Sequence, residues 1–561
     1  MKFTNILKTT ALSLGAVLAL TGCIRETLPK EGTITEGQLM AGQAEVVAEN
    51  LLKGIPSGLM TYISGWEHTD FGYHSVGIYN DYACGLMVSC GHTTGLPAGY
   101  CRFYPAAYSR GYAPNSAMPS HVWYNYYPQI KSCNDVINVV GDNESLKHYV
   151  GIARTYRAMM YLDLARMFEC LYAENENNPN YEGEQIAVAG LTVPIVDENL
   201  DEQGAKNNPR ATREEMFNFI FADLAFAEEA LAEYTPTALN NPDLSVVYGL
   251  YARAYLWLGG FDDGLSGDLP YGNEAYALAG EYARKAINAH GGAVMSEAEW
   301  TSVTNGFNVP ASSWMWGLQH SVDTVINNLF QFTAHMALEA DYGYAPLSMP
   351  GVSAKDYDRL GNADIRKKLM KGPEKSYADF KAYTSMDEAT WSSMANYTFF
   401  KFRPAGGNRT EYKAAGAVAL PLMRCEEMYF IELEAIAHTQ GNDAAMIQLI
   451  NFMTTYRDPN YMCLTNDIVG EIIFQKGIEF WGEGIKMYDM KRLDIGYASY
   501  WDDNGDGKGD SNYPADARFV LNGRAPWWSY CIPKDETDMN QAAASQGANP
   551  NPTQAFKPIT L

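Results

Sequence analysis

Positive charge is scarce in this sequence. Its 561 residues include 41 lysines and arginines against 66 aspartates and glutamates, which gives a formal net charge of −25 at pH 7. So acidic a surface repels phosphate backbones, which argues against nucleic acid as a partner. It also disfavours adsorption to anionic lipid, so attachment to a membrane would need a lipid anchor.

Familiar catalytic and metal-binding motifs are absent as well. The sequence has no GxSxG, no HExxH and no CxxC spacing, and its nine histidines are scattered. We therefore predict a protein that is not an enzyme and that requires no cofactor. A secreted glycoside hydrolase is the alternative, because such enzymes also use aromatic and acidic residues. Cys84 and Cys90 could pair in an oxidising compartment or stay free thiols.

Long apolar runs are missing too, apart from one short run near the N-terminus. It covers residues 11–20, follows Lys2 and Lys8, and is about half as long as a membrane span must be. A positive start and a short apolar run are typical of a secretory signal. The run ends in Leu-Thr-Gly-Cys, which resembles a bacterial lipobox, so we expect Cys23 to be lipidated. Ordinary signal cleavage beside an incidental cysteine is the alternative.

The signal divides the chain into three parts. We expect residues 1–22 to be a lipoprotein signal peptide that is removed, residues 23–35 to form a lipidated polar tether, and residues 36–561 to form one domain. No long Gly-, Ser- or Pro-rich stretch interrupts the last part. The protein is therefore expected to be exported and held on a membrane by acyl chains.

Much of the chain carries helical periodicity. Thr212 and Glu215 form a capping-box pattern, and apolar residues then recur at three- and four-residue steps. Residues 148–168 show the same period. Further helices are predicted at residues 36–53, 120–140, 245–258, 274–290, 424–439 and 443–456. Because these helices come in pairs joined by short turns, we predict a mainly α fold, with a tetratricopeptide-like scaffold of about four helical hairpins.

Long aromatic, glycine-rich stretches separate the helical blocks. They cover residues 62–118, 260–273, 300–420 and 496–535. Segments of this length in a compact domain are usually functional. We therefore predict a large irregular loop face with a few short strands, one of them within residues 312–321. In that strand we expect Trp314 and Trp316 to pack in the interior.

Several segments carry the motifs of a known family. The most specific are LPLMRCEEMYFIELEA (420–435), GIEFWGEGIKMYDMKRL (477–493) and the ending PWWSYCIPKDETDMN. GIARTYRAMMYLDLARMF (151–168) and LSVVYGLYARAYLWLGG (244–260) match two further signatures. Together they resemble the SusD/RagB-type nutrient-binding outer-membrane lipoproteins of the Bacteroidetes, over nearly the whole mature chain.

The resemblance implies a function at the cell surface. Such a lipoprotein would face the cell exterior from the outer membrane, bind an oligosaccharide nutrient and pass it to a SusC-like TonB-dependent transporter. Some RagB-like relatives bind peptides instead, and nothing in the sequence separates a glycan from a peptide ligand. A purely structural or adhesive helical-repeat protein is a further alternative.

Two glutamates invite a catalytic interpretation. Glu479 and Glu483 stand four residues apart, a spacing that places two carboxylates on one helix face, with Lys491 and Arg492 soon after. Such a pair could act as general acid and base. In the family that the chain resembles, these positions brace the last hairpin against the C-terminal loops, so we interpret them as structural.

The ligand is predicted to bind aromatic residues of the irregular face. A ring that stacks on a sugar also needs polar neighbours that fix its orientation. Two clusters offer both, SGWEHTDFGYHS and EADYGYAP. The predicted ligand-binding residues are Trp66, Asp70, Tyr73, His74, Asp341, Tyr342 and Tyr344. The alternative is that individual members, such as Trp66 and Phe71, belong to the core.

Residues 502–510, DDNGDGKGD, match a calcium loop. The ligand oxygens would come from Asp502, Asn504, Asp506, the carbonyl of Lys508 and Asp510, at loop positions 1, 3, 5, 7 and 9. At position 12 Tyr513 replaces the usual bidentate glutamate, so Asp516 or water would have to complete the shell. We predict a structural calcium ion here; the alternative is a plain acidic turn.

Overall fold

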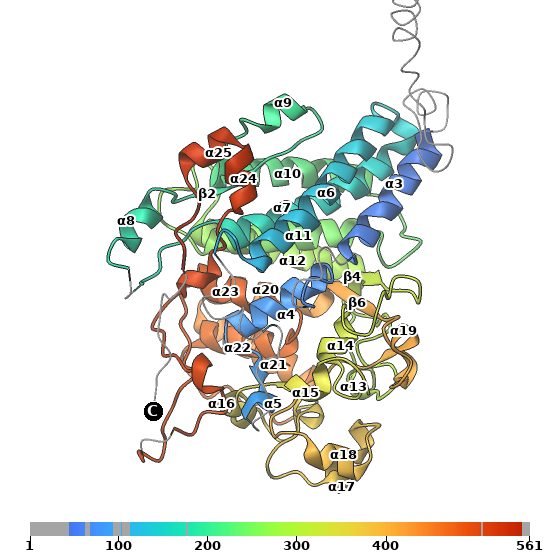
Figure 1. Ribbon diagram of the computed structural model, residues 1–561, viewed down its shortest axis with the longest axis vertical. Helices are drawn as coiled ribbons and strands as arrows, with labels where there is room; N and C mark the ends of the chain where they lie inside the picture. Colours follow the sequence, from blue (N-terminus) through green and yellow to red (C-terminus); the bar gives the residue numbers. More distant parts are fainter. Residues whose placement is uncertain are drawn as a thin grey trace, which may run out of the picture.

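A series of long helices forms the scaffold of the computed structural model, which describes residues 44–61, 68–93, 103, 113–175, 178–506 and 509–552 (Figure 1). The scaffold helices are α3 (Ala44–Leu59), α6 (Ala117–Val140), α7 (Lys147–Phe168), α10 (Arg213–Ala230), α11 (Leu244–Gly259), α12 (Gly272–His290), α20 (Cys425–Thr439), α21 (Asn442–Tyr456) and α22 (Ile468–Glu479). Each packs against the next in this order, from α3 on α6 to α21 on α22. The predicted mainly α, hairpin-based fold is confirmed.

Some predictions fall outside the described residues. These are the signal peptide, the lipidated Cys23 with its tether, the ligand residue Trp66, and Lys508 of the predicted calcium loop.

The start of α10 shows how the sequence sets the helix ends. Thr212 accepts a hydrogen bond from the backbone N–H of Glu215, and the Glu215 carboxylate accepts one from the N–H of Thr212, 2.8 Å away. This reciprocal cap satisfies two of the donors that every helix start leaves unpaired. Met216, Ile220 and Leu224 then lie on one buried face. The predicted capping box is confirmed.

Strands are few and short, and they lie outside the helical scaffold. Among the described residues, three sheets each have two antiparallel strands: β1 (Val88–Ser89) with β5 (Pro350–Gly351), β2 (Leu191–Pro194) with β3 (Arg210–Thr212), and β4 (Trp314–Gln319) with β6 (Ala419–Arg424). β4 lies within the predicted strand region. Trp314 and Trp316 are both buried, as expected, and the Trp316 indole donates to the carbonyl of Asn240 over 3.1 Å.

Short helices interrupt the segment predicted as irregular between residues 300 and 420, in the lower part of Figure 1. They are α13 (Glu297–Thr301), α14 (Phe332–Met336), α15 (Ala345–Ser348), α16 (Ala354–Arg359), α17 (Tyr377–Phe380), α18 (Glu388–Ser393) and α19 (Tyr412–Ala415). The remaining short helices are α5 (Cys90–Thr93), α8 (Tyr181–Ile186), α9 (Glu202–Ala205), α23 (Lys486–Arg492), α24 (Lys534–Met539) and α25 (Gln541–Gln546).

One full helix lies where an irregular stretch was predicted. α4 (Tyr73–Ala83) is buried at nine of its eleven positions, including polar residues such as Asn80 and Asp81. A helix that is buried all round has no polar face, so its sequence carries no 3.6-residue period. The prediction of an irregular stretch at residues 62–118 is therefore wrong where α4 runs.

Two further expectations concern the membrane and the thiols. No helix among the described residues is long and apolar enough to cross a bilayer. Cys84 and Cys90 are both buried and are not joined by a disulfide.

Candidate functional site

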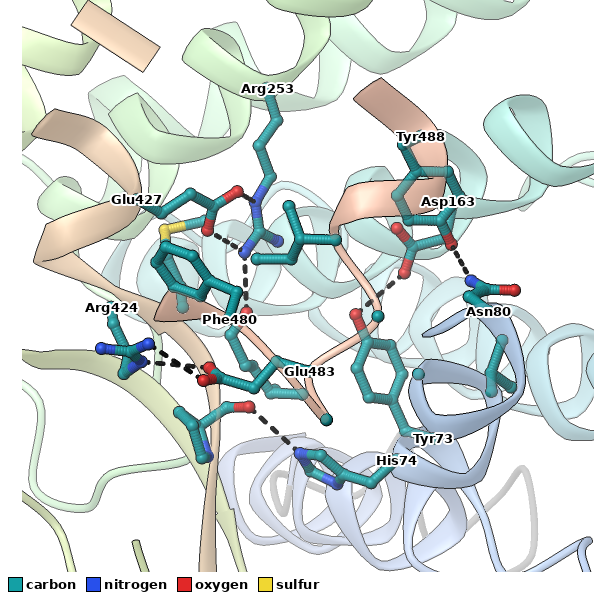
Figure 2. Close-up of a pocket in the computed structure, with 18 of the residues that line it drawn as sticks. Tyr73, His74, Asn80, Asp163, Arg253, Arg424, Glu427, Phe480, Glu483 and Tyr488 are labelled. Carbon is teal, nitrogen blue, oxygen red and sulfur yellow. Dashed lines mark hydrogen bonds and ion pairs between the residues drawn. The ribbon is translucent and has the colours of Figure 1, made fainter. Parts of the chain in front are cut away.

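A polar cavity lies where α4 meets the scaffold, and its wall holds two of the predicted ligand residues, Tyr73 and His74 (Figure 2). α4, α7, α11 and β6 contribute to the wall, together with the turn that follows α22. Charged side chains from these distant segments meet there in pairs, as the dashed lines in Figure 2 show.

Asp163 is the anion on the α7 side of the cavity. Its carboxylate accepts hydrogen bonds from the hydroxyls of Tyr73, at 3.0 Å, and Tyr126, at 3.4 Å. Arg166, one turn further along α7, forms an ion pair with it. Burial and the Asp163 charge together hold the pKa of both tyrosine hydroxyls well above the usual value, so these phenols stay neutral donors.

The opposite wall holds two arginine–glutamate pairs. Arg253 donates to both oxygens of Glu427, at 2.7 and 2.6 Å. Arg424 donates to both oxygens of Glu483, at 3.0 and 2.9 Å. Burial alone would raise the pKa of Glu483, but Arg424 and Lys401 outweigh it and hold that pKa below the usual value. Glu483 is therefore held ionised by these cations and has no poised proton to give.

The size of the cavity excludes a sugar. Its volume is about 40 Å³, which corresponds to roughly three water molecules at 10–15 Å³ each. Small-molecule sites usually measure about 300–1,000 Å³. We conclude that the cavity is a small internal space, lined by hydrogen-bonded and ion-paired side chains that connect the loop face to the scaffold.

This geometry corrects part of the ligand prediction. His74 and Asp70 are only 8% and 3% exposed, and Tyr73 is half-buried with its hydroxyl held by Asp163. The His74 Nε2 lies 3.1 Å from the carbonyl of Pro421, and burial lowers the pKa of its ring to about 4. Asp70, Tyr73 and His74 therefore pack within the protein and do not present a surface to a ligand.

The two segments that hold the predicted ligand residues, SGWEHTDFGYHS and EADYGYAP, contact each other. His68 lies 4.7 Å from Phe330 and stacks on Tyr344 at 5.6 Å, measured between ring centroids. Phe71 stacks on His335 at 5.2 Å. Tyr344 is itself buried and pairs with His68 through its hydroxyl, so it also belongs to this ring-packed interior.

Next to this interior lies what we call the Tyr342 surface, made of Asp341, which is exposed, and of Tyr342, Arg409 and Tyr412, which are half-buried. Arg409 donates to the Asp341 carboxylate over 2.6 Å and to the carbonyl of Glu339 over 2.9 Å. The Tyr342 hydroxyl lies 3.0 Å from that of Thr333, and its half-buried ring meets Tyr412 edge-on with 6.4 Å between centroids. Burial raises the pKa of Tyr342 to about 12, so it stays a neutral donor and acceptor.

The sequence analysis includes Asp341 and Tyr342 of this surface but neither Arg409 nor Tyr412. The motif NRTEY, polar and aromatic within an irregular stretch, was the available signal. Nothing in it indicates a partner 68 residues earlier in the chain, which is the separation of Arg409 from Asp341.

The structural interpretation of Glu479 and Glu483 agrees with the geometry, although the two do not share a helix face. α22 ends at Glu479, and Glu483 lies in the turn beyond it. Glu479 pairs with Arg457 at 2.7 Å and Arg424 at 3.1 Å. Lys491 and Arg492 bind elsewhere: Arg492 pairs with Glu434 and Asp489, and Lys491 donates to backbone carbonyls.

The predicted calcium loop is closed by its own hydrogen bonds. The Asp510 carboxylate accepts from the backbone N–H of Asp503 and Asn504, at 2.7 and 3.1 Å, and from the Asn504 amide at 2.6 Å. Tyr513 is buried and donates to the carbonyl of Gly85, so position 12 of the loop points inward. No group of three or more acidic, histidine or cysteine side chains in the described part of the chain is arranged to hold a metal. The calcium site stays a prediction.

The structure places the chain in the class of helical-hairpin proteins with a large loop face. Comparison with known proteins identifies the family. The family model described as "Starch-binding associating with outer membrane" matches residues 104–256, and the model of the SusD family matches residues 350–551. The two matches together cover more than half of the chain. This chain belongs to the SusD/RagB family.

Solved structures agree on the fold. A SusD-like carbohydrate binding protein from Bacteroides vulgatus is 21% identical, with a TM-score of 0.64 over 89% of this chain and 97% of that one. A SusD superfamily protein from Bacteroides thetaiotaomicron is 17% identical, with a TM-score of 0.62 over 90% and 99%. A third structure, solved with xylogluco-oligosaccharide, is 16% identical, with a TM-score of 0.56 over 91% and 99%. No curated protein matched this chain.

Proposed function

We propose that this protein binds an oligosaccharide nutrient on the Tyr342 surface. The observation that carries the proposal is the edge-to-face pair of Tyr342 and Tyr412 beside the exposed Asp341–Arg409 ion pair. Tyrosine rings offer an apolar face to a sugar ring, and a carboxylate with a guanidinium accepts and donates to its hydroxyls. Membership in a family with carbohydrate-binding relatives supports the same ligand class.

The binding protein then acts with a transporter. A lipoprotein without a channel cannot move its ligand across a membrane, so the bound glycan passes to a SusC-like TonB-dependent transporter in the outer membrane. The lipid on Cys23 holds the protein at the outer surface of that membrane, and the polar tether of residues 23–35 lets it move over the transporter mouth. The description of the matching family model, which names the outer membrane, supports this location.

A peptide ligand is the second candidate. The Asp341–Arg409 pair favours it, because a carboxylate and a guanidinium can also pair with the charged ends of a short peptide. A glycoside hydrolase is disfavoured, because Asp163, Glu427 and Glu483 are each engaged by an arginine. Neither matching family model is that of an enzyme.

The test is a titration of the purified mature protein by calorimetry. The panel contains plant and host glycans, xylogluco-oligosaccharide among them, with uncharged and charged oligopeptides alongside. We expect saturable heat from at least one glycan and no product formed from it. Binding of peptides alone would replace the glycan with a peptide ligand, and release of shorter sugars would make the protein an enzyme.

A further inference from the structure

A groove with the volume of a ligand site lies between α20 and α21, the orange helices in the centre of Figure 1. Its volume is about 320 Å³, eight times that of the polar cavity and within the usual range of small-molecule sites. Arg284 reaches it from α12. The groove shares no residue with the Tyr342 surface or with the calcium loop.

Aromatic rings form an apolar row in the groove. Phe452 lies between Tyr429 and Tyr456, with ring centroids 5.4 and 5.2 Å away. The Tyr429 hydroxyl donates to the carbonyl of Gly292 over 3.1 Å, which fixes its ring, whereas Tyr456 is 37% exposed. Because all three rings stand on helices, they present a rigid apolar surface that needs little ordering when a ligand binds.

Unengaged amides stand beside these rings. Gln448 and Asn451 lie three residues apart on α21, so they share a helix face, and both line the groove. Neither side-chain amide has a hydrogen-bond partner within the part of the chain that the structure describes. An amide both donates and accepts, which suits the hydroxyl groups of a ligand that do the same.

The charges of the groove cancel. Arg284 donates through two nitrogens to the two oxygens of Glu432, and the Arg284 Nε lies 2.8 Å from Glu432 Oε1. These are the only charged residues among those that line the groove. A site without net charge gives no advantage to a charged ligand over a neutral one. The free amides and the ion pair also interrupt the apolar lining, whereas a helical peptide needs a continuous apolar groove.

We propose that the α20–α21 groove is a second carbohydrate site, which binds one or two neutral pyranose rings. The rings of Tyr429 and Tyr456 take the apolar face of the sugar. Gln448 and Asn451 bind its hydroxyls, and the Arg284–Glu432 pair offers one further donor and acceptor set. The second site goes beyond the proposed function, since it stands on different elements and does not depend on ligand binding at the Tyr342 surface.

The test compares variants of the mature protein by saturation-transfer NMR and calorimetry. The probes are the neutral methyl glycosides of glucose, galactose, mannose and xylose, together with cellotriose, mannotriose and xylotriose. One variant carries Tyr456→Ala with Asn451→Ala, both at exposed positions of the groove. The matched control is Ile447→Ala, because Ile447 is 57% exposed on the same helix and does not line the groove. A second variant carries Tyr342→Ala with Tyr412→Ala.

We expect at least one neutral sugar to bind the wild-type protein, its affinity to fall at least tenfold in the groove variant, and the control to bind as wild type. The Tyr342/Tyr412 variant should keep this binding event, which separates the second site from the proposed function. Equal affinity in the groove variant and wild type, or binding by none of the sugars, would overturn the proposal. A peptide outcome would overturn it as well. In that case an uncharged peptide, acetylated and amidated, binds the wild-type protein saturably and the groove variant loses this binding, while no sugar binds the groove.

Discussion

Arg424, the last residue of β6, and Glu479, the last residue of α22, form an ion pair of 3.1 Å in which both side chains are fully buried. Arg457 approaches the same carboxylate to 2.7 Å. Burial alone would raise the pKa of Glu479, but Arg457 and then Arg424 and Arg366 hold it below the usual value. Four segments between residues 366 and 479 are thus joined through one anion.

Removal of that anion should destabilise the fold strongly. Glu479→Gln leaves Arg457 without its principal carboxylate in the interior, and a broken buried ion pair costs about 3–5 kcal/mol. Urea denaturation measures the loss. The matched control is Glu229→Gln, since Glu229 pairs with Lys147 at 2.6 Å but keeps 74% of its side chain exposed, and its loss should change little. Equal stability of the two variants would contradict the role of Glu479.

Asp81 should make stability depend on pH. Its carboxylate accepts from the N–H of Gly482 over 2.6 Å, and burial, only partly offset by that bond, raises its pKa from 3.8 to about 7. The unfolded chain loses the proton near pH 4, whereas the folded protein keeps it until about pH 7. The contribution of Asp81 to stability is therefore present at low pH and lost as pH rises from about 4 to 7.

Asp81→Asn removes this ionisation and keeps an acceptor for Gly482. We expect the variant to gain up to about 4 kcal/mol over wild type between pH 4 and pH 8, from three pKa units at 1.36 kcal/mol each. Unfolding free energies of both proteins across this range check it, with the exposed Asp142→Asn as control. Parallel pH curves for Asp81→Asn and wild type would show that Asp81 ionises normally.

Scaffold helices that are capped by a side chain, such as α10 and α11, could be predicted from the sequence. The sequence of α10 shows a capping box and an apolar period, and the structure has the cap at Thr212 and Glu215 and the buried face at Met216, Ile220 and Leu224. α4 could not be predicted, since polar residues such as Asn80 and Asp81 are buried beside apolar ones and leave no periodicity.

The candidate site could be predicted only in part. Asp341 is exposed and Tyr342 is half-buried, whereas His74, Asp70 and Tyr344 are buried. Burial of a histidine or aspartate depends on partners elsewhere in the chain, such as the Pro421 carbonyl that meets His74. A short sequence motif carries no information about such partners.

Ligand affinity should depend on the tyrosines of the Tyr342 surface. Tyr342→Ala and Tyr412→Ala each remove one ring of the pair, and we expect affinity for the glycan to fall about tenfold for each, since each variant loses the apolar face that packs on the sugar. Calorimetry gives the affinities, and melting curves show that the fold persists. The control is Tyr271→Ala, because Tyr271 is a tyrosine that is 47% exposed, at the N-terminus of α12 and outside the Tyr342 surface. Unchanged affinity in both variants would remove the site from this surface.

Membrane attachment should depend on Cys23. In Cys23→Ser no thiol is available for acylation, so we expect the protein to lose labelled fatty acid and to leave the membrane fraction. Fractionation of cells that carry either form measures this, and protease treatment of intact cells reports exposure at the surface. A wild-type protein that is resistant to the protease would contradict the surface location, whereas a Cys23→Ser protein that stays membrane-bound would contradict the lipid anchor.

Calcium should stabilise the loop of residues 502–510 if its oxygens bind the ion as predicted. Extracellular sites of this kind bind calcium at roughly 0.1–1 mM, so we expect millimolar calcium to raise the melting temperature and EDTA to lower it. Asp502→Ala with Asp506→Ala should erase the difference, because these are loop positions 1 and 5. Asp503→Ala should keep it, because Asp503 is not at a ligand position and instead lies 3.4 Å from Lys355. Since Asp510 already closes the loop by accepting three hydrogen bonds, identical melting with calcium and with EDTA would mean that these bonds alone hold the turn.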